Sequence, residues 1–214
     1  MTVRKHRLSP ECQQYAKEHI IARAAQADYA PLSKLDLTML HKYRDQRALT
    51  LIGIESNSLD FLAEWSELRS LKMYGCRVAD FAALTRLKYL KDFLYSHYID
   101  NRFKADLSFM ARLKHIEYLR IGSVTYLRSL PDLSKCRRLK MLQVSNCKRL
   151  NDIDSVTRIP KLESFSIVNT PQMPRDLEKI MAMKTLKKMS GAFGSKEKDS
   201  QFQQLLDKYG LVYG

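Results

Sequence analysis

One segment of the chain holds the three side-chain types of a proton-relay triad. Asp92, Ser96 and His97 offer a carboxylate, a hydroxyl and an imidazole close together in sequence. The local alternation of apolar and polar residues predicts a strand, so Asp92 and Ser96 share one face and His97 follows at the strand end. Because adjacent strand residues point to opposite faces, Ser96 and His97 are badly placed to share a proton. We therefore expect a polar, exposed strand here and no catalytic site.

Metal and redox chemistry have no better support. The cysteines never occur two residues apart, so neither a zinc knuckle nor a redox pair is predicted, and the histidines lack metal-ligand spacing. The sequence also lacks a phosphate loop, a nucleophile elbow and a paired-histidine helix motif. We expect a protein that is not an enzyme and that uses no cofactor and no metal. The residues concerned are Cys12, Cys76, Cys136, Cys147, His6, His19, His41, His97 and His115.

Composition indicates a folded, basic protein. The chain has 214 residues, of which 45% are hydrophobic, and 37 Lys and Arg against 23 Asp and Glu give a net charge of +14. This hydrophobic fraction supports a core and argues against disorder. The basic segment 1–7 is not followed by the apolar run of a secretory signal, and no stretch approaches the ~18 apolar residues of a membrane span. We expect a cytoplasmic location with reduced thiols.

An internal repeat is the strongest feature of the sequence. Apolar residues recur at the first, fourth, sixth and ninth positions of a frame, as in Leu139-Leu142-Val144-Cys147. Copies start at residues 46, 68, 90, 116, 139, 162 and 186, the first and the last being degenerate, and the interval stays between 22 and 26 residues. After the ninth position an apolar residue recurs at every third place, and this step extends the array back to about residue 32. The pattern predicts a short strand followed by a 3₁₀ or tight helical return in each copy.

This frame resembles the leucine-rich repeat family, particularly its short 22-residue type, over residues 32–194. The resemblance implies an α/β solenoid: a leucine-rich repeat horseshoe with about seven parallel strands on the concave face, 3₁₀ or short helical returns on the convex face, and helical caps at both ends. The family usually places Asn at the ninth position, where its side chain bonds backbone groups of the turn. Cys76 and Cys147 stand there in this chain, which is similar to the cysteine-containing subtype, and we interpret both as inward structural thiols.

Helical caps are expected to flank the array. Ser9-Pro10-Glu11 is typical of a helix start, and the apolar residues that follow predict a helix over about 10–27. A second helix is predicted over 200–209, with Phe202, Leu205, Leu206 and Tyr209 on one face. The domains predicted are therefore an N-terminal cap at 1–31, the array at 32–194 and a C-terminal cap at 195–214.

The variable strand positions face the concave surface, where leucine-rich repeat proteins commonly bind partners. Bulky side chains gather in the second to fourth copies, and Tyr and Arg are enriched at interface hot spots. The longest copy adds a segment with an apolar tip, Phe103, between two charges. The alternatives are an ordinary solvated face, and Phe103 packed back onto the array. The candidate protein-binding residues are Lys72, Tyr74, Asp92, Ser96, Tyr98, Arg102, Phe103, Lys104, Tyr118, Arg120 and Gln143.

Many basic residues share the repeat position just before the strand. Stacking would place them in a ridge that could meet an acidic protein or phosphates, or that could simply be solvated. Aromatic residues are not interleaved along this ridge, so nucleic acid is the less favoured partner. The ridge consists of Lys88, Lys114, Arg137, Arg138, Lys161 and Lys184.

These features favour non-enzymatic protein recognition, with a protein partner that has an acidic surface and with no membrane or small-molecule substrate. The more specific hypothesis is a bacterial immunity-type protein that binds and neutralises a toxin or effector enzyme, by fold analogy. The alternatives are a regulatory or scaffolding subunit of an enzyme such as a phosphatase, and a nucleic-acid-associated repeat protein that uses its basic rim.

Overall fold

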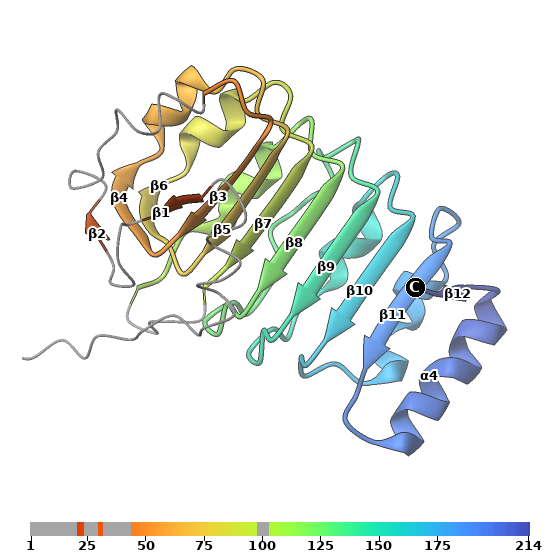
Figure 1. Ribbon diagram of the computed structural model, residues 1–214. Helices are drawn as coiled ribbons and strands as arrows, with labels where there is room; N and C mark the ends of the chain where they lie inside the picture. Colours follow the sequence, from red (N-terminus) through yellow and green to blue (C-terminus); the bar gives the residue numbers. More distant parts are fainter. Residues whose placement is uncertain (1–20, 24–29, 32–43, 98–102) are drawn as a thin grey trace, which may run out of the picture. The chain divides into compact units, whose positions relative to one another are not determined.

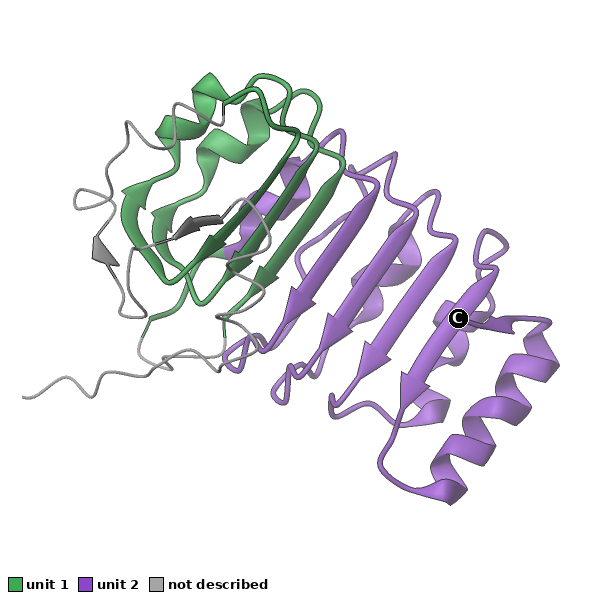
Figure 2. Ribbon diagram, viewed as in Figure 1, with its two compact units in different colours: residues 1–106 green, residues 107–214 purple. Residues whose placement is uncertain are grey.

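The computed structural model describes residues 21–23, 30–31, 44–97 and 103–214. The chain divides into two compact units, residues 1–106 and residues 107–214 (Figure 2). The boundary falls in the longest interval of the repeat frame, which runs 26 residues from Leu90 to Ile116. The repeat pattern predicts a single array over 32–194 and does not indicate this division.

Unit 1 contains two parallel sheets, each built from one strand per repeat (Figure 1). The larger sheet has the strand order β1 (Ile21–Arg23), β3 (Ala48–Ile52), β5 (Ser70–Tyr74) and β7 (Asp92–Ser96). The smaller sheet has the order β2 (Ala30–Pro31), β4 (Ile54–Ser58) and β6 (Arg77–Asp80). The returns described in this unit are the 3₁₀ helices η2 (Asp60–Glu64) and η3 (Ala82–Arg86).

Unit 2 contains one parallel sheet and a longer helix near its C-terminus. Its strands, in order, are β8 (Tyr118–Gly122), β9 (Met141–Ser145), β10 (Ser164–Val168), β11 (Lys188–Ala192) and β12 (Val212–Tyr213). The returns are the 3₁₀ helices η4 (Leu107–Arg112), η5 (Asp154–Arg158) and η6 (Pro174–Leu177) and the short helix α3 (Glu178–Met181). Helix α4 (Lys196–Tyr209) separates β11 from β12.

The repeat frame predicts the strands correctly. Each of the seven predicted strands occupies the third to seventh positions of its copy, and the fourth-position side chains are all at most 1% exposed. Parallel register brings these side chains together, so Leu142 lies between Leu119 and Phe165 in the ladder. Successive repeats are therefore held together by burial of this fourth-position apolar row on the inward face of the sheet.

Tight backbone turns follow most of the strands at the eighth position of the frame. Five eighth-position residues have φ between 53° and 64°, in the left-handed region that glycine and asparagine enter most easily. Asn169 also donates from Nδ2 to Oδ1 of Asn146 at 2.6 Å, which links two successive turns. The repeated choice of Gly, Asn or Ser was a sequence signal for these turns. The five residues are Gly53, Gly75, Ser123, Asn146 and Asn169.

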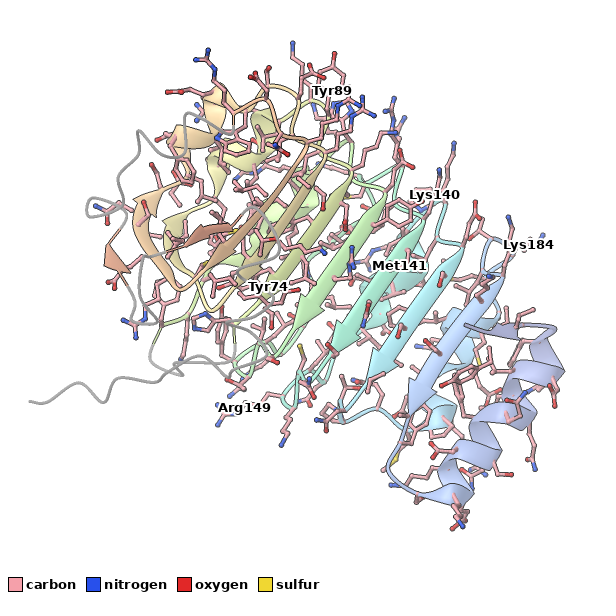
Figure 3. The ribbon with its side chains drawn as sticks, in the orientation of Figure 1. Tyr74, Tyr89, Lys140, Met141, Arg149 and Lys184 are labelled. Carbon is pink, nitrogen blue, oxygen red and sulfur yellow. The ribbon has the colours of Figure 1, made fainter. Side chains whose placement is uncertain are left out.

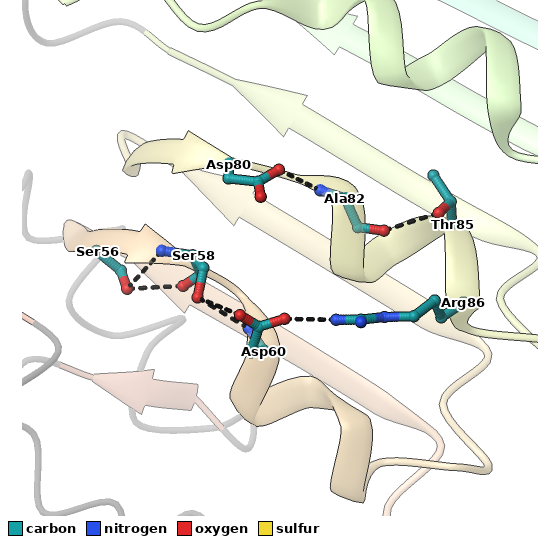
Figure 4. Close-up of polar contacts among 7 residues, drawn as sticks. All are labelled: Ser56, Ser58, Asp60, Asp80, Ala82, Thr85 and Arg86. Atoms are coloured by element: carbon teal, nitrogen blue, oxygen red, sulfur yellow. Dashed lines mark hydrogen bonds and ion pairs between the residues drawn. The ribbon is translucent and has the colours of Figure 1, made fainter.

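The returns begin with a side-chain cap that also recurs. The Asp80 carboxylate accepts a hydrogen bond from the Ala82 backbone N–H at 2.7 Å, and the Ser58 hydroxyl occupies the equivalent place before Asp60 (Figure 4). Arg86 reaches back to form an ion pair with Asp60 of the preceding repeat. These contacts satisfy backbone donors at the start of each return and tie neighbouring repeats together in unit 1.

Both ends of the strand ladder differ from the prediction. Residues Ile21–Arg23 form strand β1, which pairs with β3, so the helix predicted over 10–27 is wrong for these three residues and the ladder begins before residue 32. The remainder of that helix lies outside the described residues. The C-terminal helix is confirmed, although it begins at Lys196, where the Ser195 hydroxyl accepts from the Lys198 N–H. Strand β12 after it was not predicted.

Candidate functional site

The outward face of β8 and β9 carries the best-formed cluster of predicted contact residues. Tyr118 lies in register with Met141, and Arg120 lies in register with Gln143. Tyr118 is 41% exposed and the other three side chains are half-buried. In Figure 1 the returns of unit 2 lie behind the strands, so no described return of this unit covers the face. We call these four residues the aromatic–arginine cluster.

The outward positions beyond this cluster are small or polar. Ser190 donates a hydrogen bond to Ser166 at 2.9 Å across two neighbouring strands. The face of unit 2 therefore combines a bulky region on β8 and β9 with a flatter polar region on β10 and β11. Met141 was not among the predicted contact residues, although it occupies the same third position as Tyr118 one copy later.

Four further predicted residues lie on the outward face of the larger sheet of unit 1. Lys72 and Tyr74 belong to β5, and Asp92 and Ser96 belong to β7, with Tyr74 in register with Ser96. The Ser70 hydroxyl donates to the Asp92 carboxylate at 2.9 Å. All four side chains are half-buried, and the structure brings them together on one sheet face as predicted.

The segment after β7 is only partly described. Tyr98 and Arg102 lie outside the described residues. Phe103 is half-buried, and its ring centroid lies 5.5 Å from that of His97, so Phe103 packs back onto the repeats of unit 1. This matches the alternative interpretation of Phe103 and not an apolar tip held out in solvent. Lys104 is exposed.

The three triad-type residues are not arranged for catalysis. His97 is 3% exposed and its ring stacks on Tyr95, with centroids 6.1 Å apart and planes 5° from parallel. Asp92 and Ser96 lie on the outward face of β7, whereas the His97 side chain joins the buried side. The described residues also contain no group of three or more His, Cys, Asp or Glu that could hold a metal ion.

Charged residues form two parallel rows where the strands of unit 2 begin. The first row lies at the second frame position, where Lys140 contacts Glu117 at 2.9 Å and Lys187 contacts Glu163 at 3.1 Å. The hydrogen bond with Glu117 raises the pKa of Lys140 above its usual value. The alternation of acid and base at this position is visible in the sequence and indicates such pairing between successive repeats. The second row holds the five residues of the predicted basic ridge that belong to unit 2; these five are exposed, as is the sixth, Lys88, in unit 1.

A polar cavity of about 670 Å³ lies beside the returns of unit 2. Its carboxylates are already engaged in local structure: Asp152 accepts from the Asp154 N–H at 3.0 Å, and Asp176 accepts from the Met173 N–H at 2.8 Å. Lys179 lies 3.6 Å from Asp154. These groups cap turns and pair with one another, so their arrangement does not indicate a reaction.

Comparison with solved structures identifies the architecture. Internalin C2 from Listeria monocytogenes strain 4b F2365 matches 81% of this chain and 72% of its own, with a TM-score of 0.53 and 16% identity. Internalins are leucine-rich repeat proteins. The fold is a leucine-rich repeat solenoid. A second internalin of that strain, inlF, matches at 15% identity and a TM-score of 0.45, and this chain spans 55% of its length. No protein-family model and no curated protein matches the sequence.

Within the leucine-rich repeats, the cysteine thiols at the ninth position contact backbone carbonyl oxygens. The Cys76 thiol is fully buried and lies 3.4 Å from the Leu51 carbonyl of the preceding repeat, and the Cys147 thiol lies 3.4 Å from the Ser145 carbonyl. Cys136, at the return, contacts the Met110 carbonyl at 3.4 Å. A thiol is a weak donor, so burial of the sulfur contributes more than these hydrogen bonds do. The prediction that Cys76 and Cys147 point inward is confirmed.

These thiols are expected to resist alkylation in the native protein. Burial raises the pKa of Cys76 to about 12 and the pKa values of Cys136 and Cys147 to about 11. Because the thiolate is the nucleophile, labelling of Cys76 at pH 8 should be at least ~100-fold slower in the native than in the unfolded protein. Iodoacetamide pulses with peptide mass spectrometry measure this at each cysteine. Equal labelling rates with and without denaturant would contradict the assignment.

Helix α4 is attached to the last leucine-rich repeat through Glu178. The Lys208 ammonium donates to the Glu178 carboxylate at 2.8 Å and the Tyr209 hydroxyl donates to it at 2.9 Å. These hydrogen bonds, the one from Lys208 first, lower the pKa of Glu178 below its usual value of 4.5. Phe202 and Leu206 supply the buried side of the helix.

A pH-dependent opening of α4 follows from this contact. Since the pKa of Glu178 is lower in the folded state, its contribution is present above pH ~4.5 and is lost as the pH falls through the folded value. Glu178→Gln should speed amide exchange in α4 at pH 7, after correction for intrinsic rates, and the difference from wild type should disappear at low pH. Glu163→Gln, which removes an ion pair away from α4, serves as the control. An unchanged α4 at pH 7 would contradict the prediction.

Among the described residues, none of the helices has the length and hydropathy that crossing a membrane requires.

Proposed function

We propose that this chain is a non-enzymatic protein-recognition module that binds its partner through the outward sheet face. The aromatic–arginine cluster carries this proposal. Tyr, Arg and Met are enriched in the cores of protein interfaces, and Tyr and Arg dominate hot spots because they combine large area with hydrogen bonding. Both strands are held in a continuous ladder, so binding there costs little conformational entropy.

The more specific form of the proposal concerns the partner. We propose an enzyme, a toxin or effector, that presents an acidic surface and is neutralised in the complex. The net charge of +14 supports this choice because opposite charge speeds association and orients the two surfaces. The free buried thiols Cys76, Cys136 and Cys147 support a reducing, cytoplasmic setting.

Co-expression with the protein encoded beside this chain tests the proposal. We expect a stable complex on size-exclusion chromatography with light scattering, and loss of the partner's enzymatic activity within it. The inhibitor proposal would be rejected if the two proteins did not co-purify and if this chain did not protect cells from the partner's toxicity. A complex in which the enzyme keeps its activity but changes its substrate preference would favour a regulatory subunit instead.

A further inference from the structure

The tight turns that precede β8 to β11 carry a row of cations that the sheet face does not use. Each of three turns is closed by a backbone hydrogen bond, from Ile116 to Leu113, from Leu139 to Cys136 and from Leu186 to Met183, at 3.0 to 3.4 Å. The cations sit at the tips of these turns and of the turn at 160–161, and all are exposed. We call them the turn row: Lys114, Arg137, Arg138, Lys161 and Lys184.

The turn row contains no anion. The other residues at its turns are His115, Pro160 and Thr185, and no member of the row forms an ion pair with another described residue. The nearest carboxylates in the frame, Glu117 and Glu163, are held one row further in by Lys140 and Lys187. The local acids therefore neutralise the second frame position and leave the turn row with five positive charges.

The spacing of the row follows from the sheet. Parallel strands lie about 4.8 Å apart, so four successive turns span roughly 14 Å. Each strand of a duplex carries one negative charge for about every 3.4 Å of the helix axis, so a duplex aligned with the row presents about four phosphates of each strand over that length. A folded protein surface usually intersperses charges of both signs, which makes it a poorer match for an unbroken line of cations.

We propose that the turn row binds the phosphodiester backbone of a nucleic acid without reading its base sequence. The phosphates of the ligand supply the anions that the turn row lacks. The mutual repulsion of the five cations is relieved when these cations displace the counterions of the nucleic acid. The turn row lies at the start of the strands, and the aromatic–arginine cluster lies on their outward face. Binding of nucleic acid and binding of a protein partner therefore use different residues.

The chain offers a matched control for the test. Arg137→Gln/Arg138→Gln removes two adjacent exposed charges from the turn row. Lys148→Gln/Arg149→Gln removes two adjacent exposed charges from the opposite end of β9, so both variants lose the same net charge. Figure 3 shows Lys140 and Lys184 near one end of the strands and Arg149 near the other. Circular dichroism confirms that both variants are folded.

Fluorescence anisotropy with a labelled 20-base-pair DNA duplex measures the effect in the full chain. We expect wild-type affinity to fall with a slope of about −3.6 in log K against log salt between about 50 and 200 mM. Arg137→Gln/Arg138→Gln leaves three cations for four phosphates, so it should weaken binding at least ~10-fold at low salt and reduce the size of that slope by about 0.9. Lys148→Gln/Arg149→Gln should change affinity less than ~3-fold.

Three results would overturn the inference. Equal weakening in both variants would mean that only net charge matters. Absence of duplex binding at low salt would show that the turn row is not a nucleic-acid site. Tighter binding of poly-L-glutamate than of the duplex, with the same dependence on Arg137 and Arg138, would assign the row to an acidic protein. These results are independent of the proposed protein recognition, which is tested separately by the effect of substitutions at Tyr118 and Arg120 on partner binding.

Discussion

Replacement of Phe165 by alanine is expected to destabilise unit 2 by about 3–5 kcal/mol. Phe165 is fully buried at the fourth position of β10, and its ladder neighbours are Leu142 on one side and Met189 on the other. Both neighbours are also fully buried and are held by their own strands. The surrounding backbone cannot collapse into the space. The loss of stability is therefore the sum of the lost transfer free energy of the removed atoms and the cost of the cavity that remains.

Urea unfolding followed by far-UV circular dichroism measures this loss, and amide exchange in β9 to β11 locates it. Ser166→Ala, one residue along the same strand and on the outward face, is the control and should change stability by less than about 1 kcal/mol. A loss below about 1 kcal/mol for Phe165→Ala would show that the repeats are not held by their fourth-position row.

The second large effect is expected in partner binding. Tyr118→Ala and Arg120→Ala should each weaken affinity for a co-purified partner by about 30-fold or more, which corresponds to about 2 kcal/mol per hot-spot side chain. Tyr118 offers exposed aromatic area and Arg120 offers guanidinium donors on the same strand face, where the ladder holds them in place. Surface plasmon resonance with the immobilised partner gives the two dissociation constants.

Tyr89→Ala provides the matched control for this experiment. Tyr89 is also an exposed tyrosine, at 48%, but it lies in a turn of unit 1 and not on the sheet face of unit 2. We expect its substitution to change affinity less than ~3-fold. Wild-type affinity in both Tyr118→Ala and Arg120→Ala would reject the aromatic–arginine cluster as the binding surface.

Much of the strand ladder was predictable because its signal is local and repeated. An apolar residue at both the fourth and sixth positions predicts a strand with one buried face, and the structure places all seven strands at those positions. The inward thiols Cys76 and Cys147 and the C-terminal helix follow from the same kind of pattern. Each of these features depends on the spacing of apolar residues within about ten positions.

The candidate site was predictable only in part. The repeat frame assigned Tyr118, Arg120 and Gln143 to the outward face, because a strand alternates its side chains whatever its neighbours are. The frame did not show that Phe103 packs against His97, since that contact depends on where the segment after β7 returns to unit 1. It also did not separate the second-position charges, which form ion pairs, from the turn row, which has no ion-pair partner among the described residues, because these ion pairs join residues 23 or 24 positions apart.

The sequence by itself determined the repeat, its phase and the inward side of each strand, since one apolar row must leave water whatever the partner strand is. Only the tertiary structure decided that Ile21–Arg23 is a strand, that β2, β4 and β6 form a second sheet, and that β12 extends the ladder. Parallel pairing joins segments distant in sequence, and edge strands gain their hydrogen bonds only from a neighbour already in place. No spacing within a single segment encodes that neighbour.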